Sequence, residues 1–147
     1  MIRRLMLTAT CAAAMLVLFT TAQARNTVLR LPIADALGTA DAKSRLTGNV
    51  KFFFGAENQP TPAKTLGSAR TNKKTNFFNK SDKEGCEWAF LSAMLSFQER
   101  ALADGGDAII KIKSITNTEE LSSSTEYLCR AGNVVGGVAF VGDVVKL

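Results

Sequence analysis

Residues 81–106 have the sequence SDKEGCEWAFLSAMLSFQERALADGG and give the clearest helix signal in the chain. Ser81 and Glu84 form a capping box, in which the hydroxyl of Ser81 accepts a hydrogen bond from the amide three residues on. Gly105 and Gly106 supply the left-handed turn by which helices commonly end. Because no proline or glycine lies between Gly85 and this end, the pattern predicts one long helix.

This helix carries two apolar stripes when successive residues are placed about 100° apart. One stripe suits packing on a sheet, and its members are Cys86, Phe90, Ala93, Met94, Phe97 and Ala101. The second stripe consists of Trp88, Leu91, Leu95 and Leu102. A helix on one sheet needs a single stripe, so the second must be covered by the N-terminal half of the chain, by a second subunit or by a ligand. These four residues are therefore a candidate interface, with Trp88 the first candidate because buried aromatic anchors dominate interfaces.

The first 24 residues have the features of a secretory signal peptide. A pair of arginines precedes an apolar run over residues 5–19, and Ala22-Gln23-Ala24 is a small-x-small cleavage signal. We therefore expect cleavage after Ala24 and a periplasmic location. A lipoprotein would use Cys11, but that residue follows Thr10 and lies inside the apolar run, which disfavours a lipid anchor. No segment after residue 24 is long and apolar enough to span a membrane.

Removal of this peptide leaves 123 residues (147 less 24), enough for one domain with its own core. The mature chain has 16 basic residues (18 less the two arginines of the signal peptide) and 13 acidic residues, a net charge of +3. This mild charge favours solubility more than nucleic-acid binding, and we predict no nucleic-acid partner.

Two cysteines remain in the mature chain, Cys86 and Cys129. In an exported protein an even pair is typical of a disulfide, which here would join the long helix to a strand. The alternative is a reactive or metal-binding pair. The chain has no C-x-x-C motif and no histidine, so the residue types favour the disulfide and predict no metal and no cofactor.

Strand patterns lie on both sides of the helix, at residues 27–33, 50–54, 64–71, 108–115, 125–131 and 138–145. Residues 34–46 form a weak helical stretch that is interrupted at Gly38, with Thr39 as a cap. We predict an α+β fold, in which a mostly antiparallel sheet of about four to five strands has the long helix packed across one face. Residues 25–147 are expected to form a single domain, with a strand–helix–strand–strand–strand core at 63–147 and an N-terminal extension at 25–54.

The most basic part of the mature chain precedes the helix, where residues 72–80 are predicted to form a polar loop. Five cations fall within 14 positions and are a candidate contact for an anion or a partner: Arg70, Lys73, Lys74, Lys80 and Lys83. The alternative is a loop kept soluble by its lysines. Phe77 and Phe78, beside them, serve either as a hydrophobic staple for the helix or as an exposed anchor.

Several segments resemble known exported proteins. The helix followed by GGDAIIKI at 105–112 is similar to the helix-and-hairpin core of YbjQ-type domains and, more distantly, of the envelope-stress lipoprotein RcsF. A closer resemblance covers the mature chain and is to small exported proteobacterial proteins that are often labelled "excinuclease ATPase subunit". That resemblance is carried by LPIADAL at 31–37, TNKKTN at 71–76, CEWAF at 86–90 and EYLCRAG at 126–132.

The excinuclease label fails on chemistry. Such an ATPase needs a phosphate-binding loop of the form G-x-x-x-x-G-K-[ST], and here no glycine is followed by lysine. The heavy-metal binding ascribed to YbjQ-type domains does not carry over either, since histidine is absent and the two thiols are expected to be bonded.

No residue pattern in the sequence indicates a particular enzymatic reaction. Without histidine, a Ser–His or Cys–His nucleophile is excluded, and Glu119-Glu120 is typical of a solvated hairpin tip. We predict a non-enzymatic binding or interaction protein of the envelope, stress-related as the resemblance implies, whose partner is an envelope protein. A self-assembling structural module and an enzyme of unrecognised type are the alternatives.

Overall fold

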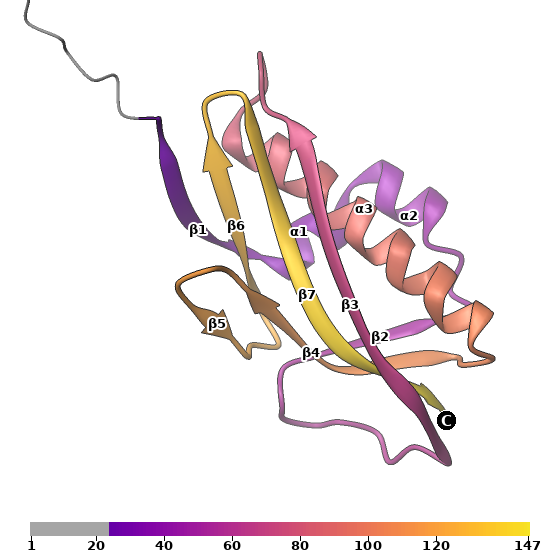
Figure 1. The fold of residues 1–147 in the computed structure, drawn as a ribbon. Helices are drawn as coiled ribbons and strands as arrows, with labels where there is room; N and C mark the ends of the chain where they lie inside the picture. Colours follow the sequence, from indigo (N-terminus) through magenta and orange to yellow (C-terminus); the bar gives the residue numbers. More distant parts are fainter. Residues whose placement is uncertain (1–23) are drawn as a thin grey trace, which may run out of the picture.

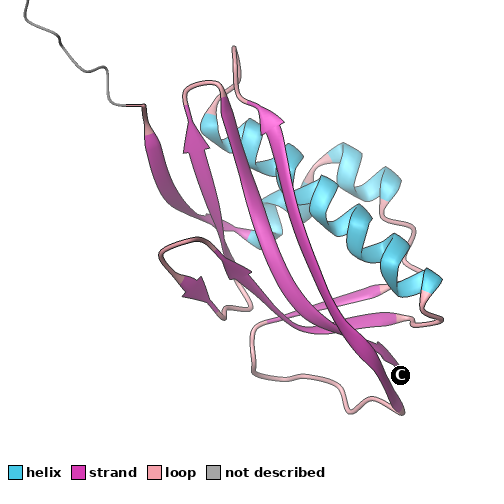
Figure 2. Cartoon of the chain, in the orientation of Figure 1, coloured by secondary structure: helices cyan, strands magenta, loops and turns pink. Residues whose placement is uncertain are grey.

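The computed structural model describes residues 24–147, so residues 1–23 of the predicted signal peptide lie outside the described part. Within it, three helices and seven strands follow one another along the chain (Figures 1 and 2). In order they are β1 (Asn26–Pro32), α1 (Ile33–Gly38), α2 (Ala40–Arg45), β2 (Lys51–Phe54), β3 (Lys64–Asn76), α3 (Asp82–Ala103), β4 (Ala108–Ile115), β5 (Glu120–Leu121), β6 (Glu126–Gly132) and β7 (Val135–Lys146).

Strand β7 is the centre of one sheet. Strand β3 pairs with β7 from Lys64↔Lys146 to Asn76↔Val135, which occupies one edge of β7. Strands β4 and β6 therefore share the other edge, in the order β1-β6-β7-β4-β2. Strand β5 pairs with β4.

The predicted mostly antiparallel sheet of about four to five strands is wrong. The sheet has seven strands, is curled and mixes parallel and antiparallel pairing, and strands hold 43% of the described residues. Strand β2 runs parallel to β4, because the chain between them crosses over through β3 and α3 before it returns. The N-terminal residues contribute β1 and β2 to the two outer positions of this path, where β1 pairs with β6.

The long helix α3 has the predicted ends. The hydroxyl of Ser81 accepts a hydrogen bond from the amide of Glu84 at 3.1 Å, and Gly105 takes a left-handed φ of 77° just beyond the last turn. The predicted sheet-facing stripe is at most 1% exposed in all six of its residues. Phe90 of this stripe packs with Phe54, Tyr127 and Phe140 in an aromatic cluster. The closest ring centroids of the cluster, those of Phe90 and Tyr127, are 4.7 Å apart.

All three helices lie on one face of the sheet, where α1 and α2 contact α3 (Figure 1). Thr39 begins α2 and accepts a hydrogen bond from the amide of Ala42, the cap that the sequence predicts. Near the other end of α3, Gln98 accepts hydrogen bonds from the backbone and the hydroxyl of Thr47. Leu91 of the second helix stripe is buried and lines one hollow together with Thr39 and Asp41, so the N-terminal half of the chain covers part of this stripe.

Candidate functional site

The sheet face opposite the helices, which we call the outer face, carries a row of small residues along β7. Cross-strand register places Arg70 opposite Val141, Asn72 opposite Ala139 and Lys74 opposite Gly137 on this face. The long polar side chains of β3 therefore stand beside the short side chains of β7. This arrangement makes the outer face of β7 the floor of a groove, which we call the outer groove.

The upper part of the outer groove is a hollow of about 280 Å³. Its charged lining residues are Arg25, Lys74 and Arg130, and no lining residue is acidic. Three amide side chains, of Asn26, Asn72 and Asn117, add hydrogen-bond donors to its wall.

Gly137 lies between two of these cations. Lys74 of β3 is its cross-strand neighbour on one side, and Arg130 of β6 is its neighbour on the other. With a strand spacing of about 4.8 Å, the backbones of Lys74 and Arg130 are about 10 Å apart, and Gly137 places no side chain between them. Neither cation has an ion pair within residues 24–147. The gap suits a carboxylate or another anion that takes hydrogen bonds from both sides.

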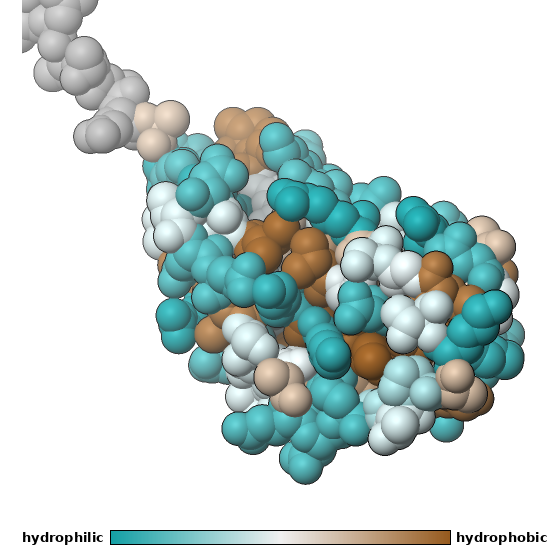
Figure 3. All heavy atoms as spheres, turned by 60° about the horizontal axis from the view of Figure 1, so that its bottom comes forward, coloured by the Kyte–Doolittle hydropathy of each residue, from teal (hydrophilic) through white to brown (hydrophobic). Residues whose placement is uncertain are grey.

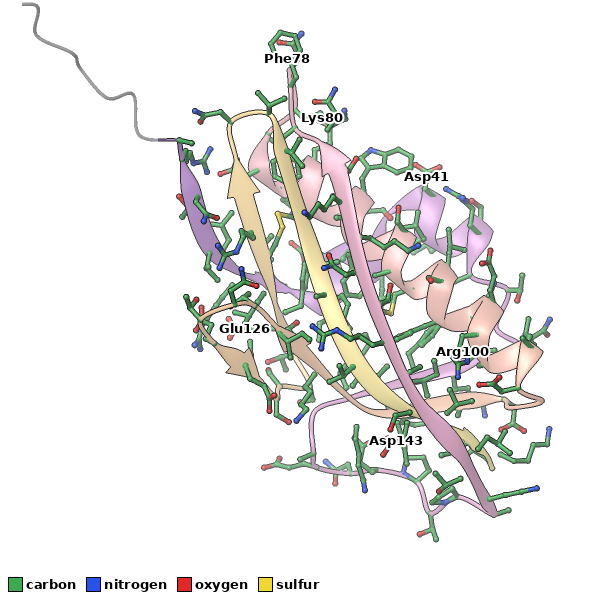
Figure 4. The ribbon with its side chains drawn as sticks, in the orientation of Figure 1. Asp41, Phe78, Lys80, Arg100, Glu126 and Asp143 are labelled. Carbon is green, nitrogen blue, oxygen red and sulfur yellow. A yellow bond between two sulfur atoms is a disulfide. The ribbon has the colours of Figure 1, made fainter. Side chains whose placement is uncertain are left out.

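The lower part of the outer groove is a wider hollow of about 570 Å³. Arg70, Lys111 and Lys113 line it together with Asp143, whose carboxylate accepts a hydrogen bond from Ser68 at 3.1 Å (Figure 4). A bulge in β4 gives Lys111 a positive φ of 52°, and the amide of this residue donates to the side chain of Gln59 at 2.7 Å. Lys113 is paired with Glu120, so this part is less positive than the upper part.

The five cations predicted as one contact surface are not brought together. Arg70 and Lys74 point into the outer groove, whereas Lys73 lies on the opposite face of β3 and is half-buried. Lys80 lies in the loop after β3 and donates to the backbone of Asn76 at 3.1 Å.

Lys83, the fifth cation, lies in the first turn of α3 and faces acidic residues of the helix layer. Its ammonium donates to the carboxylate of Asp35 at 2.7 Å, and this hydrogen bond raises the pKa of Lys83. Glu87 lies 3.7 Å from the same ammonium. Lys83 is thus engaged within the helix layer and faces away from the outer groove.

The predicted polar loop at residues 72–80 is wrong over its first five residues, because β3 continues through Asn76. Residues 72–76 are polar, and a strand segment whose side chains are largely exposed does not show the alternation of apolar and polar residues by which strands are predicted. Sequence reasoning also left out Arg130 as a site residue. Its only local signal is its position between Cys129 and Ala131, both buried, which points its side chain to the other face.

The second helix stripe is divided by burial. Leu91 is buried and Leu95 is half-buried, whereas Trp88 is 38% exposed and Leu102 is 50% exposed. Trp88 and Leu102 are 14 residues apart, about 21 Å along the helix, so they form no continuous patch. A hollow of about 140 Å³ beside Trp88 is lined by Thr39, Asp41, Glu84, Glu87 and Leu91.

Cys86 and Cys129 lie at disulfide-bonding distance, with 2.05 Å between their sulfur atoms and both side chains buried. The pair joins the first turn of α3 to β6, the strand that carries Arg130. Within residues 24–147, no three histidine, cysteine or acidic side chains are grouped as metal ligands. None of the described helices has the length and apolar character that crossing a membrane requires.

Comparisons with known proteins returned no match among family models, curated proteins or solved structures. The resemblance to small exported proteobacterial proteins and to YbjQ-type domains stays a prediction.

Proposed function

We propose that this protein is an exported, periplasmic binding protein without enzymatic activity, which holds an extended acidic segment of an envelope protein in its outer groove. The observation that carries the proposal is the pairing of Lys74 and Arg130 on either side of Gly137. Two unpaired cations that face one gap, with amide donors around it and no carboxylate in the lining, favour an anionic ligand.

The shape of the outer groove favours an extended ligand. Its floor follows β7, where Gly137 and Ala139 line the upper part and Val141 lines the lower part. Lys74 and Arg70 lie four residues apart on β3, which corresponds to about 13 Å. An extended peptide with acidic side chains on one face has the same repeat, so its carboxylates would meet both cations.

Location in the envelope rests on the N-terminal sequence and on the cysteines. The arginines, the apolar run at 5–19 and the Ala22-Gln23-Ala24 signal support export, and a buried cysteine pair at bonding distance is typical of an oxidising compartment. The resemblance to small exported proteins agrees with this location and with a stress-related role.

Binding of a fluorescent peptide of alternating Glu and Ser, followed by anisotropy, tests the proposal. We expect Lys74→Gln and Arg130→Gln each to weaken binding by roughly tenfold, as expected for loss of a hydrogen bond between charged groups. Lys43→Gln is the matched control, since Lys43 is exposed on α2, outside the outer groove and without an ion pair in the described chain. Equal binding of a Gln/Ser peptide, or equal losses in all three variants, would refute a groove that selects acidic segments.

Self-association is the second candidate function, and it is favoured by the free edge of β3. This strand has 13 residues and, among residues 24–147, pairs with β7 alone, so its other edge offers backbone groups to a second copy. Charged residues on the strand oppose such pairing, because edge lysines and arginines discourage strand addition. Native mass spectrometry separates the two candidates: a discrete oligomer without ligand supports self-association, and a monomer supports the groove.

A further inference from the structure

Three chain segments meet at one end of the molecule, which we call the tip. They are the loop between β3 and α3, the turn between β6 and β7, and the start of β1 (Figure 1). The amide of Phe77 donates to the backbone oxygen of Val134 at 2.6 Å, which joins the first two segments. Asn26 pairs with Gly132, and Arg25 is ion-paired with Asp82, which ties β1 to both.

The two adjacent phenylalanines of the tip have opposite environments. Phe77 is 3% exposed and its ring packs against Gly85 and Gly136, which is the staple that the sequence predicts as one alternative. Phe78 is 62% exposed and projects from the end of the loop (Figure 4). Both alternatives for the pair are thus realised, one in each residue.

The turn that presents Phe78 is held by local hydrogen bonds. The amide of Phe78 donates to the side chain of Asn76 at 2.7 Å, and the amide of Lys80 donates to the backbone oxygen of Phe77 at 3.1 Å. Asn79 takes a left-handed φ of 59°, a conformation that asparagine tolerates better than most residues. These hydrogen bonds hold Phe78 in an exposed position next to the turn between β6 and β7, so its side chain can add to an apolar patch only together with residues of that turn.

Exposed apolar side chains are concentrated at the tip. Of the six large hydrophobic residues that are exposed in residues 24–147, three lie here, namely Phe78, Val134 and Val135. The other three are dispersed over α3 and the C-terminus. With the opposite end of the molecule turned forward, the surface is mostly hydrophilic, with small separate hydrophobic patches (Figure 3).

The charge around these side chains is positive. Residues 72–81 contain three lysines and no acidic residue, and residues 127–142 contain Arg130 and no acidic residue. The nearest carboxylate in sequence, on Asp82, is paired with Arg25. Of these cations, Lys80 lies in the tip itself, and Lys74 and Arg130 lie beside it in the outer groove. Exposed apolar side chains next to cations are complementary to a bilayer surface with anionic headgroups.

The described part of the chain begins at the tip, where residues 24 and 25 lead into β1 (Figure 1). After cleavage, the new amino group of Arg25 would add a positive charge there.

We propose that the tip docks on the surface of a bilayer that contains anionic phospholipid. Phe78, Val134 and Val135 enter the headgroup region, and the ammonium of Lys80 contacts lipid phosphate. Strands β3 and β7 then extend away from the bilayer and carry the outer groove with them. Phe78, Val134 and Lys80 are not part of the outer groove, whereas Val135 also lines its upper part. Docking of the tip does not require a ligand in the outer groove.

Flotation with lipid vesicles tests the tip. The full chain is expressed with its own N-terminus, recovered as the cell processes it, and mixed with vesicles of phosphatidylethanolamine and phosphatidylglycerol or of phosphatidylcholine alone. We expect binding to the anionic vesicles and little to the neutral ones. Phe78→Ser should weaken it roughly tenfold, and Lys80→Gln about fivefold at low salt.

Matched controls exist on the same molecule. Leu102→Ser removes an apolar side chain that is 50% exposed and lies about 30 Å along α3 from the tip, and Lys43→Gln removes a cation from α2. Both should bind as the unchanged chain does, and so should Arg70→Gln, which alters the outer groove alone. The mass of each recovered protein is checked, and only protein that begins at Arg25 is used, so that the apolar run at residues 5–19 does not contribute to vesicle binding.

A second measurement does not depend on affinity. Trp88 is the only tryptophan, so Phe78→Trp combined with Trp88→Phe places the only indole at the tip. A shift of its emission to shorter wavelength on addition of anionic vesicles supports insertion. Unchanged emission, or equal loss of vesicle binding in Phe78→Ser and Leu102→Ser, would overturn the proposal. If the unchanged protein binds anionic vesicles but does not bind the acidic peptide, the proposed function of the outer groove is refuted and the proposed docking of the tip is supported.

Discussion

The ring of Phe77 packs between Gly85 and Gly136. This packing leads us to predict that alanine at Gly85 destabilises the protein, which is the opposite of what helix propensity predicts. Gly85 lies inside α3, where replacement of glycine by alanine usually stabilises a helix by about 1 kcal/mol. A Cβ at Gly85, however, would lie 2.6, 2.7 and 2.8 Å from three ring carbons of Phe77. Carbon atoms in contact are normally at least about 3.5 Å apart.

The ring has little room to move away. Its far side contacts β7, where a Cβ at Gly136 would lie 2.5 Å from Cζ of Phe77. Overpacking of a buried site costs about 1–3 kcal/mol, so the clash should outweigh the gain in helix propensity. We expect Gly85→Ala to lower the free energy of unfolding by up to about 2 kcal/mol in the unchanged protein.

The same substitution should have the opposite sign once the ring is removed. Phe77→Ala alone should cost about 3–5 kcal/mol, and in that background Gly85→Ala should regain up to about 1 kcal/mol. Gly38→Ala, also helical but with no atom within 4 Å of the added Cβ, is the control and should be neutral or stabilising.

Urea unfolding of the single and double variants gives the coupling between the two sites. If Gly85→Ala changes the free energy of unfolding equally with and without the Phe77 ring, the predicted clash between the added Cβ and this ring is refuted. The same packing fixes the loop that projects Phe78, so the result also bears on the tip.

Two further predictions concern the attachment of β6 to the rest of the fold. Cys86→Ala combined with Cys129→Ala opens a loop of 43 residues and should lower the free energy of unfolding in urea by about 4 kcal/mol. The unchanged protein, purified without reductant, should have a mass two hydrogens below that of the reduced chain. Free thiols in the folded protein would contradict the disulfide. Ser114→Ala removes the buried hydroxyl that accepts a hydrogen bond from the amide of Leu128 at 3.0 Å, and the orphaned amide should cost about 1–3 kcal/mol. Ser92→Ala, on the half-buried side of α3, should change stability by well under 1 kcal/mol, and equal effects of the two serine variants would argue against the role of Ser114.

The sequence predicted those features that depend on neighbours in the chain. The Ser81 cap, the left-handed Gly105 and the sheet-facing stripe of α3 each depend on residues within one or two helical turns. Thr39 as the cap of α2 is a further case. The cysteine pairing followed from parity, because only two cysteines lie after residue 24, where the sequence predicts cleavage.

Strand partners were beyond this kind of inference. Strand β3 was predicted to end too early, because the polar residues at 72–76 are held by backbone pairing with β7 and not by burial. Strand β2 was expected in a mostly antiparallel sheet, and it pairs with β4 in parallel because of the crossover that separates them. Neither fact leaves a periodic signal in the side chains.

The sequence by itself determined the long helix, the helix face that packs on the sheet, the cysteine pair and the absence of histidine chemistry. The tertiary structure alone decided the sheet order and the sites. Lys74 and Arg130 are 56 positions apart and flank Gly137 only through the register of three strands. Phe78 and Val134 share the tip because β3 pairs with β7 up to Asn76 and Val135, and because the amide of Phe77 donates to the backbone oxygen of Val134. The physical reason is that helix caps and helix periodicity depend on residues a few positions apart. Strand register is set by backbone hydrogen bonds between segments that can lie any distance apart in the sequence.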